Sequence, residues 1–387
     1  MKRRRIAIVG VGMTRFGKHR DRSLMDLLVE ASMEAIRDSR GAEPDSLFVS
    51  VMASELYENI TGPANTLAGL LGFRDKVVMR VENTSGSGGA AIFAAWTAIA
   101  SGVVDSALVV GGEKMTHKST AENAAIIATL VSDYERSTGI TLPSYAALMA
   151  RYYMSKYGID TEPLAHVAVK NHLHGSMNPK AHFQKRITLE DYYNSRVVAE
   201  PLRVMDYTPI SDGAAAVMLM ELDKALSYTD KPVLITGISG ATDTHVVHER
   251  SDLLDIMAVR RSTEKALAMA GRNRTDVGLV ELHDMATILE IVELESMGFY
   301  KPGEGWRAAV EGETRYDGSF PVNTSGGLKS KGHPIGATGV AQAYEIALQL
   351  RGLAGERQVR EIPDAAMSMS MGGFGNNAYT IVYEPGW

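Results

Sequence analysis

Four short stretches of the sequence combine glycines with side chains that can take part in catalysis. Ser85 lies in "NTSGSGG", where an apolar, strand-like run gives way to a helix-like run. His283 lies in "HDMA" and His333 in "GHPIGATG". Met371 and Gly372 begin "MGGFG". A residue at the start of a helix is close to unpaired N–H groups and their partial positive charge, and histidine exchanges protons near neutral pH. These stretches are therefore our candidates for a nucleophile, an acid or base, and donors to an oxyanion.

An internal duplication predicts which elements position these residues. "RIAIVGVG" at 5–12, an apolar strand followed by a helical pattern, has a counterpart in "PVLITGIS" at 232–239. The tetrapeptide "NTSG" occurs at 83–86 and again at 323–326. We therefore expect two tandem βαβαβ halves, each with helices covering a mixed sheet. Paired units of this kind bind ligands at the ends of their strands, which is where the four stretches fall.

The predicted first half spans residues 1–228 and the second spans 229–387, with an insertion at about 116–205 that has no counterpart in the second half. Insertions of this length are usually functional. Its stretch "NHLHGSMNPKAHFQKR" at 171–186 is rich in histidine and basic side chains. Two interpretations stay open. It is a lid or floor that contacts a polyanionic small molecule, or a solvated loop whose charges have no role, and composition alone favours the second.

Composition narrows the class of protein. The formal net charge of -6 provides no large positive field, which argues against a nucleic-acid partner. The sequence contains no cysteine, and this excludes disulfides, sulfur-ligated zinc and a thiol nucleophile. No apolar run is long enough for a membrane helix, and "MKRRRIAIVGVGM" is expected to form a first buried strand rather than a signal peptide. The cytoplasm is the expected compartment.

No metal site is predicted. The histidines of "HVVHE" at 245–249 lie three residues apart, but no carboxylate or cysteine pattern supports them, and such pairs are usually surface residues.

Taken together, the duplicated halves and the four motifs resemble the thiolase superfamily over essentially the whole chain. "GHPIGATG" is the most specific of these motifs, and "HDMA" resembles the sterol-carrier-type and archaeal acetyl-CoA acyltransferase branch. The resemblance implies an α/β fold, in which duplicated βαβαβ halves form a layered α-β-α-β-α sandwich with an inserted loop domain.

The resemblance also implies roles, and it exposes two departures. Family members have a nucleophilic cysteine where this chain has Ser85, and a second cysteine as acid or base where it has Met369 or Met285. Serine is far harder to ionise than cysteine and needs a strong base beside it. Ser85 is therefore either an engineered substitution that disables the nucleophile, or the native residue of an enzyme that forms no covalent acyl intermediate.

The implied activity is that of a thiolase-type acyl-CoA C-acyltransferase, which cleaves or forms a 3-oxoacyl-CoA by reversible Claisen chemistry and is impaired by Ser85. His283 and His333 are the expected donors to the enolate oxygen. His283 is also the expected proton carrier, because histidine titrates near neutral pH. The backbone N–H of residue 85, with that of Met371 or Gly372, is expected to hold the acyl-enzyme oxygen. No permanently bound cofactor is implied, and coenzyme A is a substrate.

Two other functions stay open: a thiolase-fold retro-aldolase that acts on a β-hydroxyacyl-CoA, and a non-catalytic thiolase-like subunit. The resemblance implies an acyl-CoA ligand, a homodimer or dimer of dimers, and a small zinc-ribbon and OB-fold partner protein. The short apolar run "KVVMRVEN" at 76–83 is expected to be an exposed edge strand that pairs with a second copy of the chain.

Overall fold

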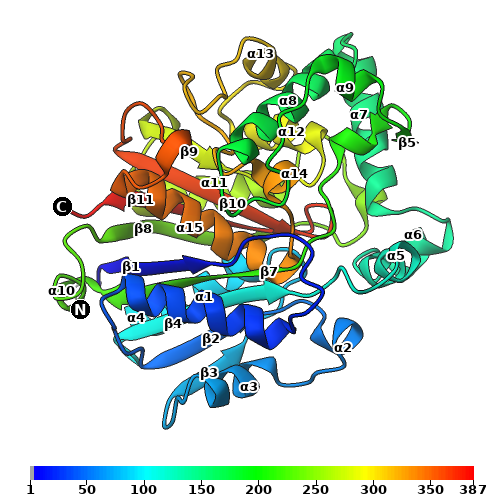
Figure 1. The fold of residues 1–387 in the computed structure, drawn as a ribbon. Helices are drawn as coiled ribbons and strands as arrows, with labels where there is room; N and C mark the ends of the chain where they lie inside the picture. Colours follow the sequence, from blue (N-terminus) through cyan, green and yellow to red (C-terminus); the bar gives the residue numbers. More distant parts are fainter. Residues whose placement is uncertain (1–3) are drawn as a thin grey trace.

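The computed structural model describes residues 4–387, and nine strands form its central sheet (Figure 1). Their order across the sheet is β3-β2-β4-β7-β1-β8-β11-β10-β9. In chain order the strands are β1 (Ile6–Met13), β2 (Ser46–Ser50), β3 (Val77–Arg80), β4 (Ser106–Glu113), β7 (Gly213–Glu221), β8 (Val233–Thr242), β9 (Val277–Glu281), β10 (Ala365–Gly372) and β11 (Asn377–Pro385). A separate small hairpin is formed by β5 (Val197–Ala199) and β6 (Leu202–Arg203).

Fifteen α-helices surround the strands in the described part of the chain. They are α1 (Leu24–Asp38), α2 (Ser54–Tyr57), α3 (Pro63–Leu70), α4 (Ser87–Ala100), α5 (Thr120–Ala128), α6 (Asp133–Ser137), α7 (Leu142–Tyr157), α8 (Glu162–Ser176), α9 (Leu189–Tyr193), α10 (Leu222–Ala225), α11 (Met257–Ala270), α12 (Thr287–Met297), α13 (Gly305–Val310), α14 (Gly327–Lys331) and α15 (Thr338–Arg351). None of the helices within residues 4–387 is both long and apolar enough to cross a membrane.

The strand order confirms the predicted duplication. Outward from the middle of the sheet, one half runs β1, β7, β4, β2 and the other runs β8, β11, β10, β9. In both halves the first two of these strand pairings are antiparallel, and the third, β4 with β2 or β10 with β9, is parallel. The halves meet where β1 pairs with β8, at Ala7↔Leu234 and Ile8↔Val233. The two expected sheets are therefore joined edge to edge through this short pairing.

Three clusters of buried apolar side chains separate the layers. One lies between the first half's strands and helices α1 and α3, and a second lies between the last half's strands and helices α11 and α12. The third surrounds α4 and α15, which pack against strands of both halves. This arrangement confirms the layered α-β-α-β-α fold. Because helices cover both faces of β1 and β4, every residue in these two strands is buried.

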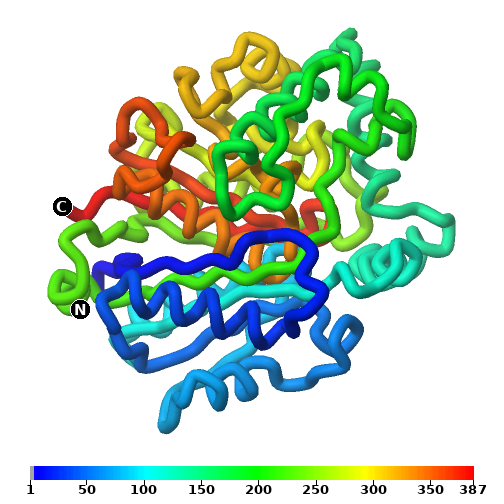
Figure 2. Tube along the Cα trace, in the orientation of Figure 1, coloured from blue at the N-terminus to red at the C-terminus, as the bar shows by residue number. Residues whose placement is uncertain are grey.

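The insertion is mostly helical rather than a loop, because it contains helices α5 to α9 (Figure 2). The first part of its basic stretch is also buried, whereas residues 183–186 are exposed. His172 and His174 are buried in α8, and each hydrogen-bonds through Nδ1 to a backbone oxygen, of Lys185 and Asn323, at 2.9 Å. The solvated-loop interpretation is therefore wrong for these histidines. His174 connects the insertion to the body of the protein through Asn323, and His172 does so through its Nε2, which lies 3.3 Å from Lys329 Nζ.

Helix α8 packs against the second copy of the "NTSG" turn. A Cβ added at Gly326 would lie 2.8 Å from the Cα of Gly175, near the end of α8. The Asn178 side-chain amide donates to the Ser325 backbone oxygen at 2.8 Å. The turn at 323–326 is thus covered by the chain itself.

The first turns of α4 and α15 touch backbone to backbone. A Cβ at Gly88 would lie 2.7 Å from the Gly339 nitrogen, and a Cβ at Gly339 would lie 2.4 Å from the Gly89 nitrogen. Side chains are therefore excluded from both positions. Ser85 lies shortly before α4 and His333 shortly before α15, so this contact sets how far apart the two residues lie.

We expect Gly339→Ala to lower the free energy of unfolding by about 1–3 kcal/mol, because the added methyl group forces the two helices apart. Urea denaturation at neutral pH measures this change. The matched control is Gly69→Ala in α3, where an added Cβ meets nothing within 4 Å. That control should be neutral or stabilising by up to about 1 kcal/mol. Equal effects of the two variants would contradict the close-contact argument.

Candidate active site

Ser85 lies on the corner between β3 and α4, as the sequence predicts. The preceding residue, Thr84, has a φ of 52°, in the left-handed region, and Gly86 is the N-cap of α4. The turn is closed by the Ser87 hydroxyl, which accepts from the Asn83 N–H at 2.8 Å and donates to the Thr84 oxygen at 2.5 Å. Ser85 therefore lies at the end of α4 that carries the partial positive charge.

The Ser85 hydroxyl makes no hydrogen bond to a base in the described part of the chain. Across residues 4–387 it hydrogen-bonds to no other side chain. A serine becomes a strong nucleophile only when an adjacent group takes its proton. This arrangement does not activate Ser85 in the way that nucleophilic serines are activated.

His333 follows α14 and precedes a short 3-10 turn, η4 (Ile335–Ala337). Its Nδ1 lies 2.6 Å from the Thr338 hydroxyl, at the start of α15. Thr338 is fully buried, so this partner is shielded from water. The hydrogen bond fixes the imidazole ring and leaves Nε2 for another partner. Burial, reinforced by the positive charge of Lys331, lowers the pKa of His333 to about 3.

His283 follows β9 and packs against His333. The two rings are perpendicular, with centroids 5.0 Å apart. The His283 backbone N–H donates to Glu293 Oε2 at 2.9 Å. Its ring is fully buried, and neither ring nitrogen has a hydrogen-bond partner in the described part of the chain.

The expectation that His283 titrates near neutral pH is wrong. Burial is the main cause that lowers its pKa well below the usual range, and the neighbouring His333 and Lys331 lower it further. Both imidazoles are thus neutral at pH 7. A neutral imidazole donates one hydrogen bond and accepts another, without bringing a positive charge into the site.

The C-terminal glycine motif lies against the Ser85 turn. A Cβ at Gly372 would lie 2.1 Å from the Thr84 hydroxyl oxygen and 2.8 Å from the Asn83 backbone oxygen. A Cβ at Gly86 would lie 3.3 Å from the Gly372 nitrogen. Met371 is fully buried at the end of β10. The fold therefore brings together stretches that lie almost 300 residues apart.

Glu113, at the end of β4, is a site residue that sequence reasoning missed. Its buried carboxylate accepts from the backbone N–H groups of Met52 at 2.9 Å, Ala53 at 3.2 Å and Gly336 at 3.0 Å. It thereby holds the "GHPIG" turn against the ends of β2 and β4. Burial outweighs these hydrogen bonds and raises the pKa of Glu113 to about 7. A glutamate at the end of an otherwise apolar strand was the available signal.

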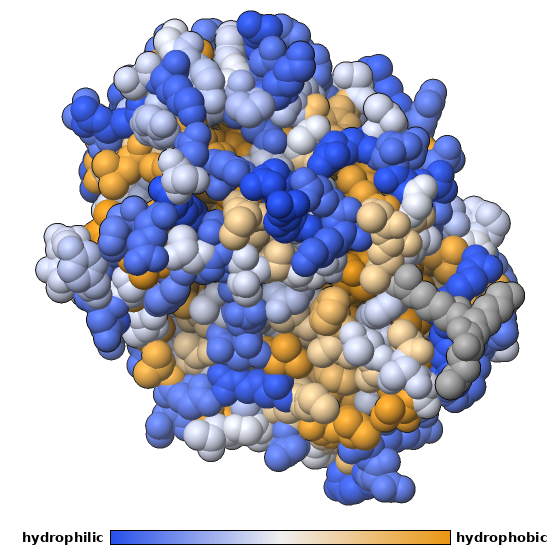
Figure 3. Space-filling model, turned by 180° about the vertical axis from the view of Figure 1, so that it is seen from behind, coloured by the Kyte–Doolittle hydropathy of each residue, from blue (hydrophilic) through white to orange (hydrophobic). Residues whose placement is uncertain are grey.

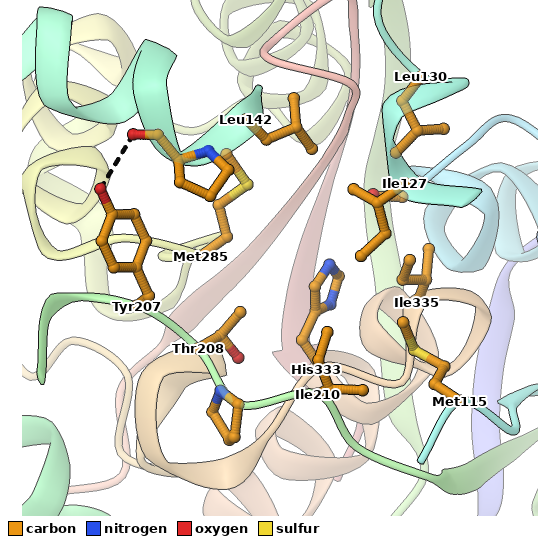
Figure 4. A pocket seen from close by; sticks show the side chains of 13 residues that line it. Met115, Ile127, Leu130, Leu142, Tyr207, Thr208, Ile210, Met285, His333 and Ile335 are labelled. Carbon is orange, nitrogen blue, oxygen red and sulfur yellow. Dashed lines mark hydrogen bonds between the residues drawn. The ribbon is translucent and has the colours of Figure 1, made fainter. Parts of the chain in front are cut away.

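A cavity of about 130 Å³ lies beside Ser85 and His333 (Figure 4). In Figure 4 the His333 ring points into it, with Met285 on one side and Ile335 on the other. His283, Met371 and Gly372 do not line it. The lining comes from several distant segments: Ser85, Met115, Ile127, Leu130, Leu142, Pro143, Tyr207, Thr208, Pro209, Ile210, Met285, His333 and Ile335.

Comparison with known proteins identifies the family. Residues 6–223 match the family described as "Thiolase, N-terminal domain", and residues 239–385 match "Thiolase C-terminal domain-like". This chain belongs to the thiolase family. This is an enzyme family of acyltransferases, and two curated relatives are named "Acetyl-CoA acetyltransferase".

Several thiolase relatives are similar along most of the chain. The acetyl-CoA acetyltransferase of Methanothermobacter thermautotrophicus is 42% identical over 384 residues, covering 98% of this chain and 100% of the relative. Sterol carrier protein 2 of Gallus gallus is 32% identical, covering 92% of this chain and 68% of the relative. The solved structure titled "Ltp2-ChsH2(DUF35) aldolase" has a TM-score of 0.84 and 27% identity, with 98% of each chain covered.

The lowered pKa of His283 predicts how thiolase stability depends on pH. Below about pH 6.5 the unfolded state binds a proton at this histidine and the folded state does not, so stability falls as the pH falls. Each such group contributes a slope of up to about 1.4 kcal/mol per pH unit. We expect His283→Asn to reduce the slope of unfolding free energy between pH 6.5 and 4.5 by up to that amount. Urea denaturation across this range measures it, and an unchanged slope would contradict the buried neutral state.

Proposed function

We propose that this chain makes and breaks the Cα–Cβ bond of a CoA thioester through an enolate, as a thiolase-type C-acyltransferase on 3-oxoacyl-CoA. The single observation that supports this most is the placement of a neutral His333 ring on the cavity wall together with Ser85. Enolate oxygen needs a fixed hydrogen-bond donor in a site shielded from water, and a buried imidazole meets that need.

In this proposal His333 is the direct donor to the enolate oxygen. Its Nε2 must then carry the proton, so Nδ1 must accept from the Thr338 hydroxyl at 2.6 Å, in competition with the Pro334 backbone oxygen, which lies 3.2 Å from the same hydroxyl. Thr338 is accordingly a positioning residue that sets the tautomer. His283 is the second candidate donor, because its ring contacts His333 and both of its nitrogens lack partners in the described chain.

The acyl-transfer half of the reaction would use residue 85 and the neighbouring backbone. We propose the N–H of Ser85, with that of Met371 or Gly372, as donors to the acyl oxygen. The hydroxyl of Ser85 would attack slowly, because no base in the described part of the chain is hydrogen-bonded to it. Met285 and Met369, at the positions of the family's second cysteine, cannot transfer a proton. We therefore propose that acyl transfer is impaired in this chain.

A retro-aldol reaction is the second candidate, and the unassisted Ser85 hydroxyl favours it. A β-hydroxyacyl-CoA would pass the proton of its hydroxyl group to water or to a neutral imidazole nitrogen as its Cα–Cβ bond breaks, and a proton would then return to the enolate at Cα. The electron pair would pass to the thioester as an enolate, and the β-carbon would leave as a carbonyl compound. No acyl-enzyme is needed. The likeness to a structure titled as an aldolase supports this alternative, and the paired histidines argue against a non-catalytic subunit.

The two candidates differ in their response to Ser85→Cys. A cysteine at the N-terminus of α4 gains thiolate character, so we expect thiolysis of a 3-oxoacyl-CoA by CoA to rise by several orders of magnitude. The measurement is mass spectrometry of products from both proteins, each incubated with CoA and 3-oxoacyl-CoAs and, separately, with the matching β-hydroxyacyl-CoAs. Cleavage of the β-hydroxy compounds by the Ser85 form would establish the retro-aldol reaction instead.

His333→Ala is the control for the enolate step that both reactions share. Loss of one oxyanion donor typically costs about 100- to 1000-fold in rate. The rate at which α-protons of acetyl-CoA exchange with deuterated water should fall by that amount, whether His333→Ala is made in the wild-type protein or in the Ser85→Cys variant. Unchanged exchange would remove His333 from the enolate role and with it the proposed function.

We also propose that the chain forms a homodimer, or a dimer of dimers, through β3. This strand is at the edge of the sheet, and Val77 and Met79 are 43% and 50% exposed. Figure 3 shows hydrophobic residues gathered on the lower part of the rear face, over the half of the molecule that contains β3. An additional small zinc-ribbon and OB-fold partner is in keeping with the DUF35 component named in the aldolase structure.

Sedimentation at low micromolar concentration tests the dimer. We expect at least twice the 41.8 kDa of one chain, because an unpaired apolar edge strand pairs readily with a copy of itself. Met79→Lys should shift the mass toward one chain, whereas Leu148→Lys on the exposed side of α7 should not. A wild-type mass of one chain would rule out the dimer.

A further inference from the structure

The cavity beside Ser85 also indicates which part of a CoA thioester it accepts. Among the described residues that line it, the only hydroxyl groups besides that of Ser85 are those of Tyr207 and Thr208. The Tyr207 hydroxyl donates to the Pro143 oxygen at 2.9 Å, and the Thr208 hydroxyl donates to the Leu328 oxygen at 2.6 Å. Both hydroxyl protons are therefore already donated within the protein, so towards a ligand these two groups act only as hydrogen-bond acceptors.

The pantetheine arm of coenzyme A does not suit this lining. That arm contains two amide groups, and an amide buried without hydrogen-bond partners costs a few kcal/mol. Most of the remaining lining side chains are aliphatic or methionine, and the proposed function assigns His333 to the enolate oxygen. The cavity is therefore suited to the acyl part of the substrate, and the acyl part must be uncharged.

The size of the cavity limits the acyl group further. Its volume is about 130 Å³. For comparison, an apolar cavity of about 150 Å³ in another protein binds benzene. A group near the size of one aromatic ring therefore fills the space, whereas an acetyl group leaves most of it empty and a long linear chain exceeds it.

The insertion sets this size. Ile127 comes from α5, Leu130 from the connection after it, and Leu142 from the start of α7. In Figure 4 these three side chains lie on the far side of the cavity from Thr208 and Ile210. The wall that limits acyl length is thus made by the segment that has no counterpart in the second half.

We propose that the acyl substrate carries a compact, uncharged group of about the size of a benzene ring, aryl or branched aliphatic, next to the β-carbon. This inference rests on the proposed function, because it takes the cavity beside Ser85 and His333 as the acyl site. It excludes long linear fatty acyl groups as the preferred substrates.

Binding to the Ser85 protein tests the proposal without requiring turnover. The probes are acetoacetyl-CoA, benzoylacetyl-CoA and 3-oxododecanoyl-CoA, each titrated calorimetrically into the full chain. Burial of the aromatic ring should make benzoylacetyl-CoA bind at least about tenfold more tightly than acetoacetyl-CoA. It should also bind more tightly than the long-chain thioester.

Variants of Ile127 test whether the cavity wall determines the preference for benzoylacetyl-CoA. Ile127→Trp fills the cavity, so the affinity ratio of benzoylacetyl-CoA to acetoacetyl-CoA should fall toward one. Ile127→Ala enlarges the cavity. It should therefore reduce the difference in affinity between benzoylacetyl-CoA and 3-oxododecanoyl-CoA. The matched control is Leu148→Trp on α7, where the side chain is 49% exposed, and it should keep the wild-type ratio.

The outcomes separate this proposal from the function on which it rests. Equal or tighter binding of the long-chain thioester, or a ratio that Ile127→Trp leaves unchanged, would overturn the acyl-size proposal alone. Failure of all three thioesters to bind would overturn the proposed function and the acyl-size proposal together.

Discussion

The geometry of the site depends on the close approach of α4 and α15. These helices come from different halves of the duplicated chain, and their first turns touch at Gly88 and Gly339 without intervening side chains. Each helix begins just after a residue of the site. A side chain at either glycine would move Ser85 and His333 apart, so a steric requirement at two positions determines how the halves share one cavity.

A second constraint is electrostatic. Glu113 holds the turn before α15 through a backbone N–H group and holds the end of β2 through two more. The histidines are kept neutral by burial and by the nearby Lys331, whose ammonium group pairs with Glu281 at 3.5 Å. A site of this kind offers hydrogen-bond donors of fixed direction and does not depend on mobile protons in the histidines. That is the setting in which an oxyanion is stabilised most strongly.

The sequence predicted what depends on local pattern. The Ser85 corner and the duplicated strands follow from glycine placement and apolar periodicity, the layered fold follows from the resemblance to thiolases, and the structure confirms all three. It did not predict what depends on packing between distant segments. The low pKa of His283 results from complete burial, which a single histidine in "HDMA" does not reveal. Ile127 and Leu142 reach the cavity only because the insertion folds back over it. The burial of His172 and His174 escaped prediction for the same reason.

The packing of α8 against the second "NTSG" turn has a consequence for stoichiometry. A duplicated fold begins with two equivalent crevices, one for each half. In this chain the crevice of the second half is filled by Gly175 and Asn178 of the insertion, which belongs to the first half. The two halves therefore have the same strand order, but only the turn of the first half is left uncovered by the insertion. One half contributes a partly exposed turn and the other a fully buried one, so the proposed catalytic centre has no second copy within residues 4–387.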